Sequence, residues 1–189
     1  SHDWMLAIWG TASESAPSAI LEGHENAVQA VAADPSGRWI ASGGADRSVK
    51  IWNVETHDAR RTYRNNSDFI SNLAFSPDGA TLAVGSLDGT IKVLSVNSNR
   101  VQRGFAGQNK RITSLALANG DDMLASADEG GNVRIRSLKR SRQLLALPGL
   151  SSGARTVAFT NDGRTLLTGG QDGAVRLWSL PDSQIAQGN

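Results

Sequence analysis

The sequence contains no cysteine, which excludes disulfide bonds, thiolate catalysis and metal sites built on cysteine. It also has no apolar run long enough to cross a bilayer, so we expect no membrane insertion. Neither sign of charge dominates, since 19 Lys and Arg stand against 18 Asp and Glu. A balance this close to neutral argues against a polyanion as the main partner, and we therefore do not expect nucleic acid binding.

Convincing helical periodicity is missing as well, and the chain instead repeats with a period of 42 residues. The turn positions on this period are Gly37, Gly79, Asp121 and Gly163. Two further series on it are Trp52, Leu94, Arg136, Trp178 and Asp46, Asp88, Gly130, Asp172. A fixed period of this length indicates an array of small β units. The sequence therefore predicts an all-β chain with units at 23–64, 65–105, 106–148 and 149–189, preceded by the end of a partial unit at 1–22.

Each unit has the same internal plan of three strands joined by polar turns. In the first unit the apolar residues Val28 and Val31 are out of step for one face of a strand, which predicts a β-bulge between them. The turn at 34–37 contains Pro and Gly at positions suited to a tight reversal. The second strand, at 40–43, lacks bulk, and we expect it to lie tightly between neighbouring sheets.

Units of this length, with Gly23-His24 near the start and Trp52 closing the third strand, resemble the WD-repeat (WD40) family of β-propellers. The resemblance implies a propeller of four-stranded antiparallel blades, here four full blades plus a partial one, which is open as given. It also implies a structural tetrad formed by His24, Ser42, Asp46 and Trp52. In such a tetrad carboxylate, imidazole, hydroxyl and indole form one chain of hydrogen bonds, which satisfies four buried polar groups.

The other units depart from this tetrad. At the His position they have Asn66, Gln108 and Leu150, at the Trp position Leu94, Arg136 and Trp178, and at the Asp position the third unit has Gly130. No unit ends in a true Trp-Asp pair. We therefore expect the complete tetrad only in the first full unit.

The trio His24, Ser42 and Asp46 also contains the residue types of a nucleophile triad. We favour the structural interpretation, because the hydroxyl is expected inside a blade and bonded to an indole. His2 and His57 are not grouped at metal-ligand spacing. The sequence thus predicts no enzyme activity, no cofactor and no metal site.

Two clusters of basic residues are Arg60, Arg61, Arg64 and Arg134, Arg136, Lys139, Arg140, Arg142. One interpretation is a rim that pairs with an acidic partner or phosphate. The other is a set of solvated outer strands whose charges block edge pairing. The second is favoured, because aromatic residues are not interleaved with the basic ones as single-stranded nucleic acid binding would require.

The resemblance implies that a partner binds the face formed by the loops that enter the first strands and the turns between second and third strands. The candidate partner-binding residues on that face are Asn26, Arg47, Phe69, Leu87, Arg111, Arg155 and Gln171. Phe69 and Leu87 are expected to be exposed apolar groups, with Arg111 and Arg155 as anchors, since such contacts dominate interface energy.

The expected function is that of a non-catalytic scaffold for protein–protein interaction, as the C-terminal part of a larger propeller or multidomain protein. The alternative is a regulatory or sensor module, or an accessory subunit, of a larger signalling, secretion or enzyme assembly. The open ends are expected to expose apolar faces, which another chain or an upstream segment would cover by supplying the missing blades; a self-assembled oligomer is the less favoured route. A cytoplasmic location is expected.

Overall fold

A computed structural model describes residues 4–10, 16–64, 66–98, 100–106, 108–118, 122–150 and 153–180. Every regular element in these ranges is a β-strand, which confirms the all-β fold. No helix in the described ranges is long and apolar enough to cross a membrane. The fourth strand that the sequence suggests after Pro181 lies outside the described residues, as does most of the turn at 119–122.

The strands form five antiparallel sheets, and within each sheet strands that follow one another in sequence are hydrogen-bonded neighbours. The first sheet contains β1 (Leu6–Ile8) and β2 (Ala19–Leu21); the second β3 (Val28–Ala33), β4 (Trp39–Gly44), β5 (Val49–Asn53) and β6 (Ala59–Tyr63); the third β7 (Ile70–Phe75), β8 (Thr81–Ser86), β9 (Ile91–Ser95) and β10 (Val101–Phe105); the fourth β11 (Ile112–Leu117), β12 (Met123–Asp128), β13 (Val133–Ser137) and β14 (Arg142–Leu147); and the fifth β15 (Ala154–Phe159), β16 (Thr165–Gly170) and β17 (Val175–Ser179). We call each sheet a blade and number the four from β3 onward one to four.

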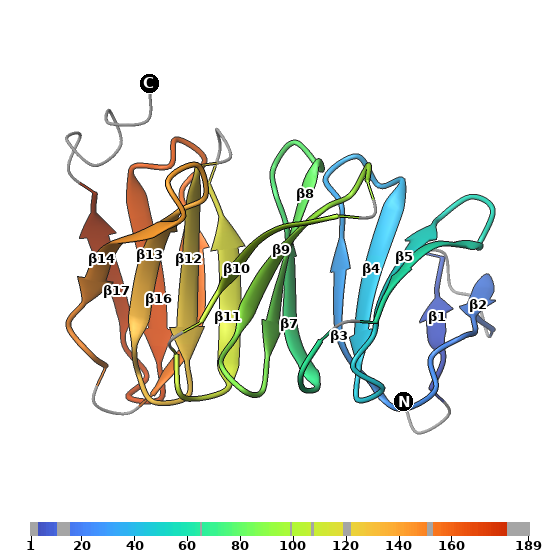
Figure 1. Cartoon of the computed structure of the whole chain (residues 1–189), viewed down its shortest axis with the longest axis horizontal. Coiled ribbons are helices and arrows are strands. Elements are labelled where there is room, and N and C mark those ends of the chain that lie inside the picture. Colours follow the sequence, from blue (N-terminus) through green and yellow to red (C-terminus); the bar gives the residue numbers. More distant parts are fainter. Residues whose placement is uncertain are drawn as a thin grey trace.

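The blades stand side by side in sequence order, and the array does not close: β1 and β2 lie at one end of the long axis and β15 to β17 at the other (Figure 1). The opening strands of consecutive blades are neighbours and are joined by side-chain hydrogen bonds. The Ser71 hydroxyl donates to the carbonyl of Ile112, and the Thr113 hydroxyl donates to the carbonyl of Ala154, each over 2.7 Å. These bonds help to hold blades two, three and four in register with one another.

The bulge predicted in the opening strand is confirmed, and it occurs in all four blades. The pairing register shifts between Val28 and Ala30 in blade one, and equivalent shifts lie at 70–72, 112–114 and 154–156. The extra residue turns Val28 and Val31 to the same face of the strand. Because the bulge recurs at the period of the sequence, each opening strand presents the same face to the preceding blade.

The core lies between blades rather than within one sheet. Val49 and Ile51 of β5 are buried against Ile70 and Leu73 of the next opening strand, in one apolar cluster. Close approach at this boundary depends on the second strand. A Cβ added at Gly43 would lie 2.3 Å from Cγ2 of Ile70. The prediction that second strands lack bulk in order to fit between sheets is therefore confirmed.

Candidate functional site

The structure brings His24, Ser42, Asp46 and Trp52 of blade one into a single hydrogen-bonded chain. The His24 Nδ1 lies 2.8 Å from Oδ2 of Asp46, and its Nε2 lies 2.7 Å from the Ser42 hydroxyl. The indole N–H of Trp52 donates to the same hydroxyl over 2.7 Å. Since the carboxylate accepts, Nδ1 of His24 carries the proton and Nε2 accepts from Ser42. The polar side-chain groups of these four residues thus all have a hydrogen-bond partner.

Asp46 is held by more than the imidazole. Its carboxylate also accepts from the backbone N–H groups of Glu25 and Ser48, each over 2.9 Å. Burial works to raise the pKa of Asp46, but these hydrogen bonds and that of His24 outweigh it and hold the pKa below its ordinary value. Burial lowers the pKa of His24, against the hydrogen bond and charge of Asp46, which favour the protonated imidazole. A neutral His24 beside an ionised Asp46 results at neutral pH.

The geometry of these residues speaks for a structural role over nucleophilic catalysis. The Ser42 side chain is fully buried, and its oxygen already donates to His24 and accepts from Trp52. A nucleophile must reach its substrate, and a hydroxyl enclosed on all sides cannot. The chain of bonds instead ties the loop before β3 to β4, to the turn at 44–48 and to β5.

Blade three builds a different polar network in the equivalent place. Its Ser126 hydroxyl donates to Oε1 of Gln108 over 2.7 Å, and Nη1 of Arg136 donates to Ser126 over 2.6 Å. The side-chain N–H of Gln108 lies 3.5 Å from Oδ2 of Asp128. The side-chain amide of Asn132 donates to both carboxylate oxygens of Asp128. Asp128 therefore supplies the carboxylate that Gly130 cannot, from two positions earlier in the chain.

Arg136 corrects one sequence expectation. Its cluster was interpreted as solvated outer strands, but Arg136 lies on the third strand of its blade and is buried. Burial, and after it the charge of Arg134, lowers the pKa of Arg136 to about 10, so the group stays charged at neutral pH. The buried charges of Arg136 and Asp128 are connected through Gln108. Sequence reasoning missed this network, because Asp128 is not at the periodic Asp position.

Blades two and four keep less of the network. In blade two Val84 and Leu94 occupy the hydroxyl and indole positions and pack in an apolar cluster. In blade four the indole of Trp178 donates to the Thr168 hydroxyl over 2.9 Å, and Leu150 fills the imidazole position as a buried apolar side chain. The complete set of four tetrad residues therefore lies in blade one alone, among the residues that the structure describes.

The seven candidate partner-binding residues all lie in or beside the loops before the opening strands and the turns after the second strands. These loops and turns lie at one end of the blades, along the lower edge of Figure 1. The loop before each opening strand and the turn after each second strand are joined there by backbone hydrogen bonds. Examples are Leu87 N to Phe69 O over 3.0 Å and Gln171 N to Gly153 O over 3.1 Å. We call this surface the loop face. The fold thus gathers these residues on one surface, and their role in binding stays a prediction.

Two of the seven differ from expectation in exposure. Asn26, Arg47, Arg111, Arg155 and Gln171 are exposed. Phe69 and Leu87 were expected to be exposed apolar groups and are only partly exposed. The physical reason is local: their backbones bond each other, which draws the two short loops together and covers part of both side chains. The exposed candidate residues of the loop face are therefore polar or basic, and they lie beside the exposed acidic side chains of Asp88 and Glu129.

The two ends of the array expose side chains that are buried elsewhere. On β17, Val175 and Leu177 are 67% and 70% exposed, whereas their equivalents in blade three, Val133 and Ile135, are buried. Near the other end, Val31 of β3 faces the partial sheet of β1 and β2 and is 62% exposed, although its equivalents in the later blades are buried. A hollow of about 260 Å³ separates β1 from β3 there. The expectation that the open ends expose apolar faces is confirmed.

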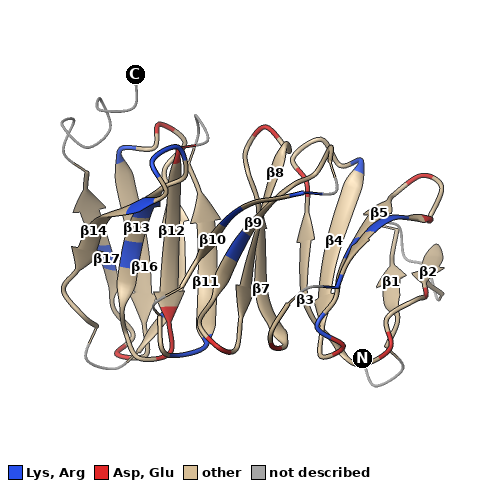
Figure 2. Cartoon of the chain, viewed as in Figure 1, with Lys and Arg blue, Asp and Glu red and all other residues tan. Residues whose placement is uncertain are grey.

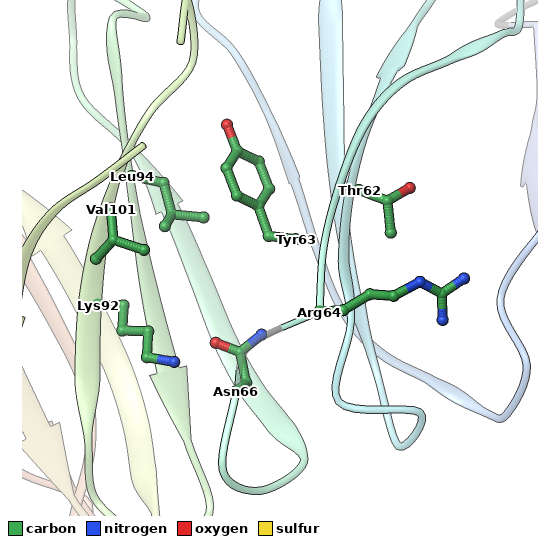
Figure 3. Close-up of a pocket in the computed structure, with 7 residues that line it drawn as sticks. All are labelled: Thr62, Tyr63, Arg64, Asn66, Lys92, Leu94 and Val101. Atoms are coloured by element: carbon green, nitrogen blue, oxygen red, sulfur yellow. The ribbon is translucent and has the colours of Figure 1, made fainter. Parts of the chain in front are cut away.

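One small pocket lies between blades one and two, lined by residues of β6 and β9 (Figure 3). Its volume is about 120 Å³, which is below the size of sites that bind drug-sized ligands. In Figure 3 the side chains of Lys92 and Asn66 approach each other, while Arg64 points away from the pocket. Arg64 instead forms an exposed ion pair with Glu25 over 2.9 Å. The pocket is not suited to an organic substrate.

Comparison with known proteins gives short, repeat-length matches. The ribosome biogenesis protein BOP1 homolog of Monosiga brevicollis is 38% identical over 42 residues, which are 22% of this chain and 5% of that protein. The ribosome biogenesis protein WDR12 homolog of Brugia malayi is 31% identical over 67 residues, 33% of this chain and 16% of that protein. The pre-mRNA-splicing factor PRP46 of Yarrowia lipolytica is 29% identical over 70 residues, again 33% and 16%. The chain thus spans at most about a sixth of the length of these relatives.

The family described as WD domain, G-beta repeat matches residues 15–53, 58–95 and 141–179, which together make up more than half of the chain. Each matched segment joins the last strand of one sheet to the first three strands of the next. The matches leave out 96–140, the unit in which Gln108, Asp128 and Arg136 replace the tetrad. The periodic blades, the tetrad of blade one and these matches lead to one conclusion: the chain belongs to the WD40 repeat family.

Proposed function

We propose that this chain is a rigid, non-catalytic platform for protein–protein interaction and that its partner binds the loop face. The observation that carries the proposal is the gathering of two loops from every blade at one end of the array, with their backbones bonded to each other. Hydrogen bonds between opening strands hold blades two to four in register, and apolar packing joins blade one to blade two, so the loops keep their relative positions. A preorganised surface of this kind loses little conformational entropy when a partner binds.

The exposed residues of the loop face suit a polar partner. Arg111 and Arg155 are exposed in successive blades. Gln171 lies close to Arg155, because its backbone N–H donates to the carbonyl of Gly153, two residues before Arg155. Arginine is enriched among residues that dominate interface energy, because its guanidinium forms several hydrogen bonds in a fixed geometry. The absence of catalysis is part of the proposal, and the enclosed hydroxyl of Ser42 supports it.

We further propose that other WD blades, from another chain or another segment of the same protein, cover the open ends. At each internal boundary the positions equivalent to Val175 and Leu177 are buried by the next opening strand. The same contact at the end of the array would remove two strongly exposed apolar side chains from water. Self-association of this chain is the competing way to cover them.

The names of the relatives suggest a setting. Those proteins are called ribosome biogenesis proteins and a splicing factor, which favours the interpretation of this chain as part of a subunit of a large assembly. An accessory role in a signalling, secretion or enzyme assembly is the second candidate, and the exposed ends support it equally. We propose a location in the cytoplasm or, as for splicing, the nucleus, to be checked by fluorescence microscopy of the tagged protein.

Affinity capture with matched variants tests the platform. Arg111→Glu with Arg155→Glu reverses two exposed charges on the loop face, while Arg38→Glu with Arg164→Glu reverses two exposed charges at the opposite ends of the blades. We expect proteins captured by the wild type to be lost with the first pair and retained with the second. Equal capture by both variants would remove the loop face as the binding surface.

A further inference from the structure

A groove runs beside the outer strand of blade two, on the side that faces blade three. It has a volume of about 500 Å³ and lies between β10 and the turn after β13. Three basic side chains line it, Arg100, Arg103 and Lys139, and all three are exposed. We call it the outer groove. It lies on the strands at the outer edge of the array and is separate from the loop face.

The charged side chains among the described residues that line the outer groove are all basic, although the whole chain is nearly neutral. An acidic group lies next to this lining, since the Asp122 carboxylate accepts from the backbone N–H of Lys139 over 2.8 Å. In the sequence, 89–120 and 130–161 contain no Asp or Glu, whereas they contain five and six Lys and Arg respectively. In Figure 2 the acidic segments lie at or next to the turns at the two ends of the blades, and basic segments cross the strands between, including β9 and β10. Both signs occur at the ends of the blades, but the strand segments beside the groove show only basic residues in this view.

Arg103 is fixed in a way that suits binding. Its Nε donates to the carbonyl of Leu138 over 3.1 Å, and its Nη1 donates to the carbonyl of Gln102 over 2.8 Å. A guanidinium has five N–H donors, so these two bonds orient the group and leave others for a ligand. A positioned cation binds a carboxylate with less loss of side-chain entropy than a mobile one.

The strand that borders the groove also contributes an apolar side chain to it. Val101 is 49% exposed and stands beside Leu94 in the small pocket of Figure 3. Val101 lines the outer groove as well as that pocket, where Lys92 provides a further cation. A ligand crossing β10 would therefore meet cations on both sides of an apolar residue. β10 is also an edge strand, since among the described residues it pairs with β9 alone.

We propose that the outer groove binds an extended acidic segment of a partner protein, with one of its apolar side chains placed on Val101. An extended peptide fits these features, because its backbone can form hydrogen bonds with an edge strand. Its acidic side chains can pair with the flanking cations. Nucleic acid fits less well, because the described residues that line the groove include no aromatic side chain for base stacking. The inference rests on the proposed platform function and adds a second surface to it.

The probe for this surface is a fluorescein-labelled ten-residue peptide of alternating Glu and Val, titrated with the full chain and followed by fluorescence anisotropy. The same peptide with Gln for Glu and a ten-nucleotide oligouridylate are the comparison ligands. We expect the Glu peptide to bind at least tenfold more tightly than the Gln peptide, and its affinity to fall as salt rises. Arg100→Glu with Lys139→Glu should weaken binding at least tenfold, and Arg100→Gln with Lys139→Gln should weaken it less.

The loop-face pair Arg111→Glu with Arg155→Glu is the matched control, because it changes the net charge equally. Circular dichroism would establish that each variant is folded. No binding of the Glu peptide to the wild type, or equal loss with the groove pair and the loop-face pair, would overturn the proposal. Tighter binding of oligouridylate that depends on the same groove residues would also overturn it, in favour of a nucleic acid site.

The two proposals fail in different ways. If the Glu peptide does not bind the outer groove while partner capture still depends on Arg111 and Arg155, the platform function is supported and the groove proposal is rejected. If the loop-face variants change no capture but the groove variants abolish peptide binding, the acidic-segment site stands without the loop face.

Discussion

Gly85 and Ile112 meet across the boundary between blades two and three so closely that a Cβ on Gly85 would lie 2.6 Å from Cγ2 of Ile112. Gly43 and Ile70 have the same relationship one boundary earlier. At the third boundary Ala127 and Ala154 are both fully buried in one apolar cluster. A glycine faces an isoleucine twice, and an alanine faces an alanine once. At each boundary a small residue at the end of the second strand therefore leaves room for the opening strand of the next blade.

Substitution of Gly85 by Ala tests this relationship. We expect a loss of about 1–3 kcal/mol in the free energy of unfolding, because the added methyl group must displace the next opening strand. Urea denaturation would measure it. Gly104→Ala is the control, since a Cβ there has no atom within 4 Å and should change stability little. The double variant Gly85→Ala with Ile112→Ala copies the third boundary, and its loss should be smaller than the sum of the single losses.

Removal of His24 should weaken blade one. His24→Ala leaves Asp46 and Ser42 without a shared partner, and we expect a loss of about 1–3 kcal/mol, or roughly 3–10 °C in melting temperature. Differential scanning calorimetry would measure it against His57→Ala, whose side chain is exposed. An unchanged melting temperature for His24→Ala would contradict the structural role of the tetrad.

The same residue predicts a dependence of stability on pH. The pKa of His24 is lowered in the folded chain from its ordinary value of 6.5, so at mildly acidic pH the unfolded chain binds more protons at this position. The free energy of unfolding should therefore fall as pH decreases through about 6.5 and below. A second decline should follow near and below pH 3.8, because the pKa of Asp46 is also lowered. Melting curves of the wild type and His24→Gln between pH 7.5 and 5 would show a flatter profile for the variant.

Blade three should depend on Arg136. Arg136→Ala would leave the buried carboxylate of Asp128 and the Gln108 amide without their cation, and we expect a loss of about 3 kcal/mol or more. The neighbouring Arg134 is less buried, so Arg134→Ala is the matched control and should cost clearly less. Equal losses in chemical denaturation would show that the network contributes nothing beyond general charge.

The exposed end should govern self-association. Val175→Ser with Leu177→Ser removes the apolar side chains of β17, and we expect less dimer or aggregate by multi-angle light scattering than in the wild type. Val101→Ser is the control, because this valine is also exposed but lies on an outer strand. If that control reduced association as much, the end of the array would not be the contact surface.

Much of this structure could be predicted from the sequence, because the period places residues of the same role at the same offset. The bulge at Val28 and the small second strands depend on short-range geometry that every unit repeats. The network of Asp128 was missed, since a carboxylate two positions away can reach the same place and no period encodes that. A signal for Arg136 existed: its position matches Trp52 and Trp178, which points to the interior.

Exposure on the loop face was harder to predict. The burial of the Phe69 and Leu87 side chains depends on how closely two short loops pack against each other. The spacing of these residues in the sequence does not contain that information. The outer groove was also hidden, because Arg103 and Lys139 come from different units and are brought together only by the packing of neighbouring blades. Features within one repeat were accessible from the sequence, and features between repeats mostly were not.

The hydrogen bonds from Ser71 to Ile112 and from Thr113 to Ala154 join only adjacent blades. In an array of this kind stability is transmitted from neighbour to neighbour, much as in a one-dimensional chain of coupled units. A blade in the interior is supported on two sides and a terminal blade on one. The array would thus lose order from its ends inward, and a ring closed by further blades would convert this gradual loss into a single cooperative transition.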